Sequence, residues 1–170
     1  MGSVIYEAPM EVLQRCARAA GVASLVASPP NDWDSRGLLN VPGLVWIAES
    51  DTCLTGRLEA PQNIAYDEFG AEFVFRQPRT EAELAQVMRA AYADPFAAYR
   101  FDGFERWTYA SASAWFNTTH VVTAWLERML TETQPSEIRD GAVAALDYLG
   151  GADFDAYRSA LLIQLHRRVR

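Results

Sequence analysis

The chain has 170 residues, half of them hydrophobic, and a net charge of −7 at pH 7. A chain of this length can bury a large core without disulfides or a structural metal, and its two cysteines are too few for a disulfide framework. The acidic balance and the scattered arginines exclude the basic stripe that nucleic-acid binding requires. We expect a single globular domain, residues 1–170, with no cofactor, no metal and no nucleic-acid partner.

The first half of the chain predicts one helix followed by several strands. Pro9 and Gly21 stand where a helix typically begins and where it has just ended, which predicts a helix over residues 9–20. Residues 22–40 are irregular in pattern. Short apolar runs bounded by turn residues then indicate strands. The expected strands span residues 44–48, 54–60, 64–66 and 72–77.

The second half predicts mostly helices. Thr80 and Glu83 form a capping box that begins a helix, and Pro95 ends it. An aromatic-rich segment follows, with a strand expected near residues 106–110. Apolar positions at helical spacing then predict three more helices, over residues 118–130, 137–149 and 154–169. This order predicts an α+β fold: a small, mostly antiparallel sheet packed against several helices, with a helical C-terminal third.

Three side chains are the candidates for nucleophilic chemistry. Cys53 lies at a turn beside Asp51, and Thr118 and His120 lie at the start of a predicted helix. A nucleophile needs a base within hydrogen-bonding reach, and Thr118 and His120 are two residues apart, a spacing that does not bring side chains together on a helix. Asn117 or Thr118 can instead cap the helix. Cys16 is expected inside the core.

A second candidate site is the loop that contains Asp32, Trp33 and Asp34. A tryptophan between two aspartates in a Pro-rich loop is suited to act as a contact anchor for a partner. Two carboxylates at this spacing could also hold a divalent cation, but a solvated loop explains them equally well. We expect a protein-binding role for this loop and no metal.

The segment from Tyr109 to Leu126 includes the run Asn117-Thr118-Thr119-His120 followed by an apolar helix pattern. It resembles the loop and nucleophile-bearing helix of circularly permuted papain-like domains, over about half the chain, roughly residues 44–130. The resemblance implies an α+β fold and places the nucleophile position at Thr118, where the family has cysteine. No histidine precedes His120, although the family carries one on an early strand. The resemblance therefore implies a catalytically degenerate copy.

These features support three functional hypotheses. The first is a degenerate papain-like bacterial domain that acts through protein binding in an effector or conflict system. The second is an acidic immunity or inhibitor-type protein of unrelated α+β fold, and the third is an active cysteine- or threonine-type amidase or peptidase. The sequence leaves enzymatic activity open.

All 15 basic side chains are arginine, and none is lysine. A GC-rich bacterial genome explains this composition, and avoidance of lysine-directed tagging in a host cell is the alternative. The longest charge-free stretch, residues 107–126, is interrupted by polar side chains and is not expected to insert into a membrane. No secretory signal is evident. We expect a cytoplasmic protein, or one delivered by a secretion system without a cleavable signal.

Overall fold

The computed structural model of the chain describes residues 8–27 and 33–168. The helices are α1 (Met10–Ala20), α2 (Ala23–Ala27), α3 (Gly56–Glu59), α4 (Glu81–Ala93), α5 (Gly103–Arg106), α6 (Tyr109–Asn117), α7 (Thr119–Thr131), α8 (Ser136–Leu149) and α9 (Ala152–Arg168), with a 3-10 turn η1 (Trp33–Ser35). The strands are β1 (Trp46–Ile47), β2 (Ile64–Tyr66), β3 (Glu72–Val74) and β4 (Tyr99–Arg100).

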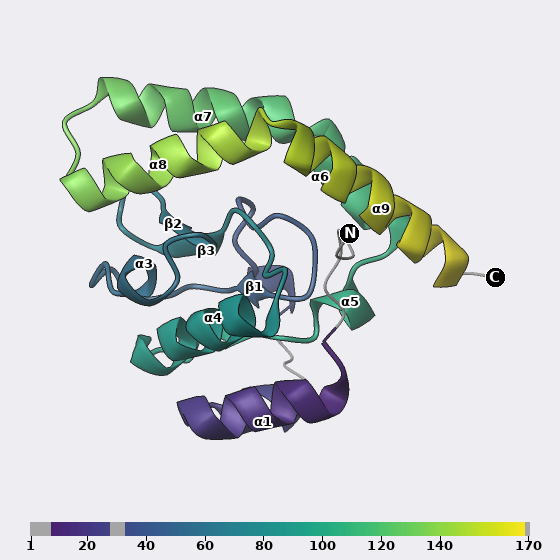
Figure 1. Ribbon diagram of the computed structural model, residues 1–170. Helices are drawn as coiled ribbons and strands as arrows, with labels where there is room; N and C mark the ends of the chain where they lie inside the picture. The colour runs from purple at the N-terminus through teal and green to yellow at the C-terminus, as the bar shows by residue number, and fades with distance from the viewer. Residues whose placement is uncertain (1–7, 28–32, 169–170) are drawn as a thin grey trace.

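These elements form three layers (Figure 1). Helices α6, α7, α8 and α9 make one outer layer, the short strands and irregular segments lie in the middle, and α4 and α1 lie on the other side. The strands form two antiparallel pairs, β1 with β4 and β2 with β3. The expected fold class, α+β with a helical C-terminal third, is confirmed.

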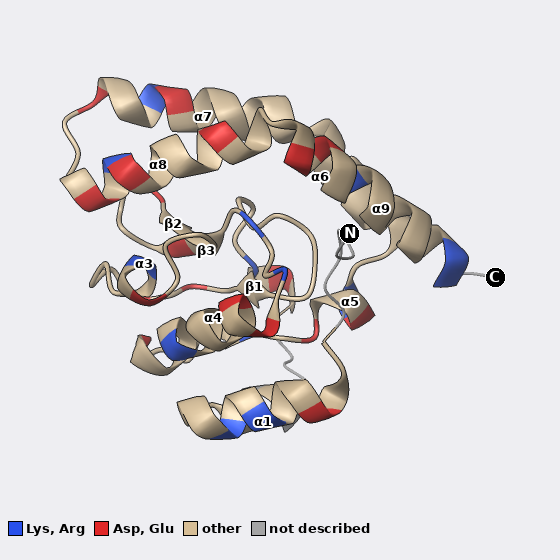
Figure 2. Cartoon of the chain, in the orientation of Figure 1, with Lys and Arg blue, Asp and Glu red and all other residues tan. Residues whose placement is uncertain are grey.

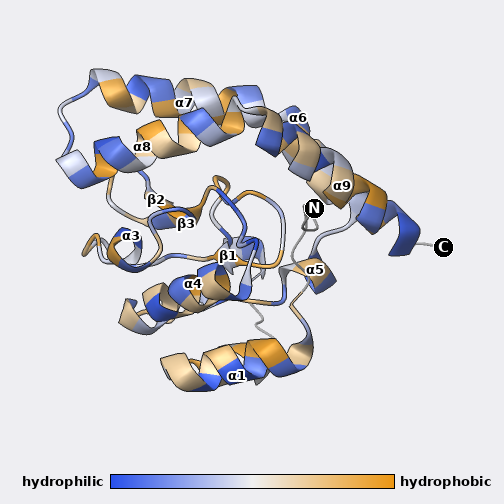
Figure 3. Cartoon of the chain, viewed as in Figure 1, coloured by the Kyte–Doolittle hydropathy of each residue, from blue (hydrophilic) through white to orange (hydrophobic). Residues whose placement is uncertain are grey.

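The long helices begin and end where the sequence predicts, within one or two residues. Gly21 closes α1 in the left-handed conformation, with φ of 78°, which glycine adopts without strain. The Thr80 side chain caps α4 by accepting a bond from the Glu83 N–H. Each of these helices is amphipathic, and Figure 3 shows apolar and polar stretches alternating along α7 and α8.

Two strand expectations are corrected by the structure, and one strand lies where none was expected. Residues 54–60 contain the short helix α3, because Leu54 adopts a positive φ of 60° and turns the chain. The region 106–110 holds no strand: α5 ends at Arg106, and α6 begins at Tyr109 because Thr108 and Ser111 cap each other's backbone N–H groups. The partner of β1 is β4, which lies seven residues earlier than the expected strand.

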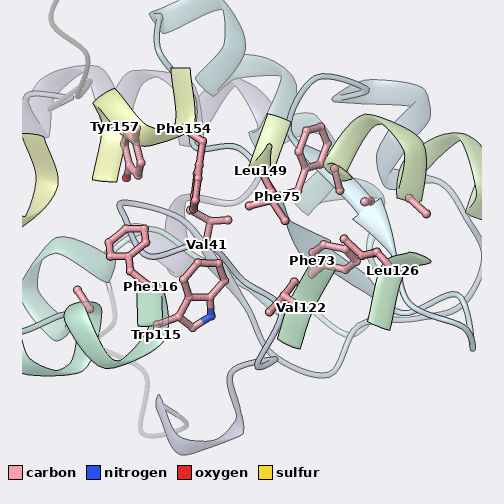
Figure 4. Packing of buried hydrophobic residues seen from close by; sticks show 14 of the residues in the cluster. Val41, Phe73, Phe75, Trp115, Phe116, Val122, Leu126, Leu149, Phe154 and Tyr157 are labelled. Carbon is pink, nitrogen blue, oxygen red and sulfur yellow. The ribbon is translucent and has the colours of Figure 1, made fainter. Parts of the chain in front are cut away.

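Two hydrophobic clusters lie on the two sides of the β2–β3 hairpin. Within the hairpin, Ala65 pairs with Phe73 and belongs with it to the cluster under α6–α9. The neighbouring pair, Ile64 and Val74, belongs to the cluster with α1 and α4. Figure 4 shows the first cluster, where Phe73 lies near Leu126 of α7. The alternation of strand side chains thus joins both helical layers to one small hairpin.

A buried, non-repetitive segment, residues 40–47, runs through the centre of the molecule. Its backbone polar groups cannot reach water and need partners within the protein. The Asn40 side chain supplies four hydrogen bonds. Its amide donates to the carbonyls of Gly37 and Ile47, both at 2.8 Å, and its Oδ1 accepts from the N–H groups of Ile47 and Val74.

A second side-chain amide completes this network. Gln77 donates to the carbonyls of Val41 and Val45 at 2.7 and 2.8 Å, and accepts from the Val45 N–H at 2.9 Å. The buried hydroxyl of Tyr157 donates to the Pro42 carbonyl at 2.8 Å, which ties α9 to the same segment. Gly43 fits here because a Cβ would collide with Gln77 and Tyr157.

We predict that Asn40→Ala lowers the free energy of unfolding by about 3 kcal/mol, because it leaves the N–H groups of Ile47 and Val74 buried without acceptors. Urea denaturation followed by tryptophan fluorescence measures the change. Asn117→Ala, at an exposed position of α6, is the control. Equal stabilities of the two variants would contradict a supporting role for Asn40.

Candidate functional site

The three candidate nucleophilic residues do not form a catalytic pair. Thr118 and His120 are both exposed, at the junction of α6 and α7. The Thr118 hydroxyl donates to the Trp115 carbonyl at 2.7 Å, so its proton points into the helix end and not toward an imidazole. Among the described residues, no hydrogen bond links Cys53, Thr118 or His120 to one another.

The expected capping role of Thr118 takes a different form. Its side chain accepts no bond from a free N–H of α7. Its backbone carbonyl instead accepts from the N–H of Val121 at 2.8 Å, while its own N–H donates to Trp115. Thr118 is therefore the single residue between α6 and α7, and its backbone is hydrogen-bonded to both helices.

Cys53 is exposed, and Cys16 is buried on the inner face of α1, as expected. The Cys53 N–H donates to Asp51 Oδ1, so the thiol lies next to a carboxylate. Burial, and then the Glu81 carboxylate, raise the pKa of the Cys16 thiol. The Arg15 guanidinium acts in the opposite direction on the pKa of Cys16 but does not outweigh burial, so this thiol is not activated.

Trp33 is used inside the protein. Its ring lies 5.1 Å from both Trp46 and Trp107, edge to face, and the Arg36 guanidinium lies 4.4 Å above it. The tryptophan is half-buried and does not protrude as a contact anchor. Asp34 is exposed, and Asp32 lies outside the described residues.

The structure contains an open apolar groove of about 540 Å³ beside α7. One wall is a face of α7, which presents side chains three and four residues apart. The other wall is formed by the loops that contain residues 38–39 and 67–69. We call this the apolar groove. Its lining residues are Leu38, Leu39, Asp67, Glu68, Phe69, Trp115, Thr118, Val121, Val122 and Trp125.

The rim of the apolar groove projects large apolar side chains into solvent. Leu38 is 81% exposed, Phe69 is 77% exposed and Val121 is 56% exposed. Scattered exposed apolar residues are ordinary, but several around one groove mark an interaction surface. Trp125, expected in the buried stripe of its helix, is half-buried because it faces this groove.

Hydrogen bonds hold both loops of the apolar groove in place. The Trp115 indole N–H donates to the Leu38 carbonyl at 2.8 Å, which fixes the first loop to α6. In the second loop, Asp67 Oδ1 accepts from the N–H groups of Phe69 and Ala71 at 2.9 and 2.8 Å. The groove is therefore formed before any partner arrives.

A smaller hollow of about 260 Å³ adjoins the apolar groove and shares Leu38, Leu39 and Asp67 with it. We call it the acidic hollow. Its other lining residues include Glu49, which is exposed. Of the described residues that line the two hollows, none is lysine or arginine.

Only part of this site is evident in the sequence. Thr118, a candidate for nucleophilic chemistry, lines the apolar groove, whereas Leu38 and Phe69 are not among the candidate residues. Phe69 lies in the turn between β2 and β3, residues 67–70, where a large apolar side chain is unusual. That mismatch between a turn and its apolar tip was the available signal.

One buried carboxyl group lies behind the β2–β3 hairpin. Glu72 is 4% exposed and accepts bonds from the Gly56 N–H at 2.7 Å and from the Tyr99 hydroxyl. Burial raises the pKa of Glu72 to about 7, although both hydrogen bonds oppose the shift. A Cβ at residue 56 would overlap this carboxylate, so Gly56 allows the contact. Glu72 is thus enclosed and joins β3, α3 and β4.

None of the helices in residues 8–27 and 33–168 combines the length and the apolar character of a membrane span. Across these ranges no cluster of three or more His, Cys, Asp or Glu side chains could hold a metal ion. Arginines and carboxylates are interspersed on most helices, and the last turn of α9 is basic (Figure 2).

Comparison of the chain with protein-family models, with curated proteins and with solved structures finds no match. The fold and its surface define an α+β domain with an open, preformed apolar groove next to an acidic hollow. Its function is inferred from those features.

We predict that Glu72→Gln removes a pH dependence of stability. Because the pKa of Glu72 in the fold lies above its ordinary value of 4.5, the folded state holds the proton more tightly between pH 4.5 and about 7. This contribution to the free energy of unfolding is complete below pH 4.5 and is lost as pH rises through 7.

From pH 4 to pH 8 the natural chain should therefore lose about 3 kcal/mol of unfolding free energy that Glu72→Gln does not lose, since glutamine does not titrate. Urea denaturation at each pH measures it, with Glu132→Gln, at an exposed carboxylate, as control. A difference that stays constant over this range would show that Glu72 is not the titrating group.

We also predict that the two cysteine thiols react with a maleimide reagent at different rates. A maleimide reagent should modify Cys53 at the rate of a free thiol and leave Cys16 protected until the protein opens, because Cys16 is only 8% exposed. Mass spectrometry of Cys53→Ser and Cys16→Ala identifies the modified residue. Rapid labelling of both cysteines would contradict the packing of α1.

Proposed function

We propose that this chain is a non-catalytic domain that binds a partner protein through the apolar groove. The observation that carries the proposal is the exposed rim of Leu38, Phe69 and Val121 around a preformed groove. Small-molecule sites enclose most of their ligand, whereas this rim points outward and offers area to a larger partner. An apolar centre with a polar rim is also the usual arrangement of a protein interface.

The polar groups beside the groove support binding over catalysis. The Thr118 hydroxyl is engaged with Trp115, and His120 follows it by two residues on the helix. A nucleophile and its base must lie within about 3 Å of each other in the working enzyme. The amidase or peptidase hypothesis therefore has no supporting pair of residues here.

We further propose the degenerate papain-like origin and the role in a bacterial effector or conflict system, which rest on the Asn117-to-His120 segment and on the lysine-free composition. An acidic immunity or inhibitor-type protein is the second candidate. It is favoured by Asp67 and Glu68 in the groove lining, together with the net charge of −7. Both candidates use the same surface.

Two neighbouring residues of α7 provide a test. Val121→Arg places a charge in the apolar groove and should abolish partner capture, while His120→Ala should leave capture unchanged. The natural chain and both variants, each tagged, are used to capture proteins from one bacterial lysate, and mass spectrometry identifies the captured proteins. Each protein whose capture is lost with Val121→Arg is then purified, and its binding to the natural chain is measured by calorimetry. Thermal melts of both variants confirm that each is folded.

Two results would reject the proposal. Capture that survives Val121→Arg would show that the apolar groove is not the binding surface. A hydrolytic activity of the natural chain that is lost in a stably folded His120→Ala variant would restore the enzyme hypothesis.

A further inference from the structure

The apolar groove and the acidic hollow meet at one carboxylate. Asp67 lines both, and the bonds that it accepts from the loop backbone both use Oδ1. Its second oxygen makes no hydrogen bond within the described part of the chain. The carboxylate is therefore held in a fixed orientation with one acceptor atom left for a ligand.

The charges around this junction are of one sign. Glu68 lines the apolar groove with Asp67, and the exposed Glu49 and the buried Glu72 line the acidic hollow. The nearest basic residue in the sequence of these loops, Arg36, is committed elsewhere, because its guanidinium lies over the rings of Trp33 and Trp107 and donates to the Trp33 carbonyl. Among the described residues, the charged side chains that line the two hollows are all acidic, and a ligand meets them next to an apolar surface.

The walls of the groove favour a helical ligand. The α7 wall consists of side chains at positions i, i+3, i+4 and i+7, which form a ridge along the helix. An extended segment gains affinity from the unpaired backbone of a strand edge, and no residue of β1–β4 lines the apolar groove. A helix satisfies its own backbone and needs only an apolar face.

We propose that the occupant of the apolar groove is an amphipathic helix of the partner protein that carries a lysine or arginine at the end nearest the acidic hollow. This inference rests on the proposed protein-binding function and adds the chemistry of the partner. The apolar face of the helix packs between Val121, Leu38 and Phe69, and its basic side chain passes Asp67 toward Glu49.

The test is a selection from a phage-displayed helical peptide library. The apolar stripe of each peptide is kept and its other positions are random. Selection on the natural chain is followed by removal of phage that also bind Val121→Arg. We expect the enriched peptides to carry lysine or arginine at one end of the stripe.

The charge contact is then measured with one enriched synthetic peptide by fluorescence anisotropy. Glu49→Gln and Asp67→Asn should each weaken binding about fivefold, the effect of one partly exposed ion pair. Replacing the basic residue of the peptide by glutamine should weaken binding similarly and remove the effect of both protein variants. Asn at position 67 keeps the Oδ1 acceptor of the loop, and Glu127→Gln, exposed on α7 outside the groove, matches the change in charge.

The possible outcomes separate the two proposals. If no peptide depends on Val121, both the proposed function and this inference fail. If peptides depend on Val121 but lack a basic residue, or are insensitive to Glu49→Gln and Asp67→Asn, the binding function stands and the inference is overturned. Self-association of the chain that is lost in Val121→Arg, seen by sedimentation, would identify a second copy as the occupant and also overturn it.

Discussion

The architecture depends on how the central segment, residues 40–47, satisfies its backbone. Only Trp46 and Ile47 belong to a strand, so most of this buried stretch has no regular ladder to supply hydrogen bonds. Two side-chain amides, Asn40 and Gln77, replace that ladder with five bonds to the backbone of the segment, and Asn40 makes two more to Gly37 and Val74. An amide suits this position because it donates and accepts at once, whereas a carboxylate or an aliphatic side chain would leave buried groups unpaired.

The same network shapes the surface. Asn40 holds the Gly37 carbonyl, and Trp115 of α6 holds the Leu38 carbonyl one residue later. The loop that carries Leu38 and Leu39 is therefore fixed at its base from two sides. Leu39 packs against the core, and Leu38 remains exposed. The exposed position of Leu38 on the rim of the apolar groove is therefore set by the hydrogen bonds that hold the loop on the core.

The sequence predicted those elements whose signals are local. Capping residues and helical spacing located α1, α4, α7, α8 and α9, because Thr80 with Glu83, and Gly21 after α1, act within a few residues. One misassigned region depends on a distant partner, because α3 starts where the Gly56 N–H meets the Glu72 carboxylate, sixteen residues away. The other, the start of α6, depends on a local capping box of Thr108 and Ser111 that lacks the usual Glu or Gln. The groove was missed because Leu38, Phe69 and Val121 become neighbours only in the folded chain.

The distribution of polar groups bears on the proposed binding function. Two groups of the kind that an enzyme could use already hold the fold: Glu72 accepts bonds from Tyr99 and Gly56, and Thr118 donates to Trp115. Using such a group for catalysis would expose it to substrate and remove bonds that the buried backbone and helix ends require. The side chains left at the surface of the groove are apolar rims and oriented carboxylates such as Asp67. Such a surface discriminates between an apolar basic ligand and an acidic one, because an acidic group placed there would be desolvated against like charge.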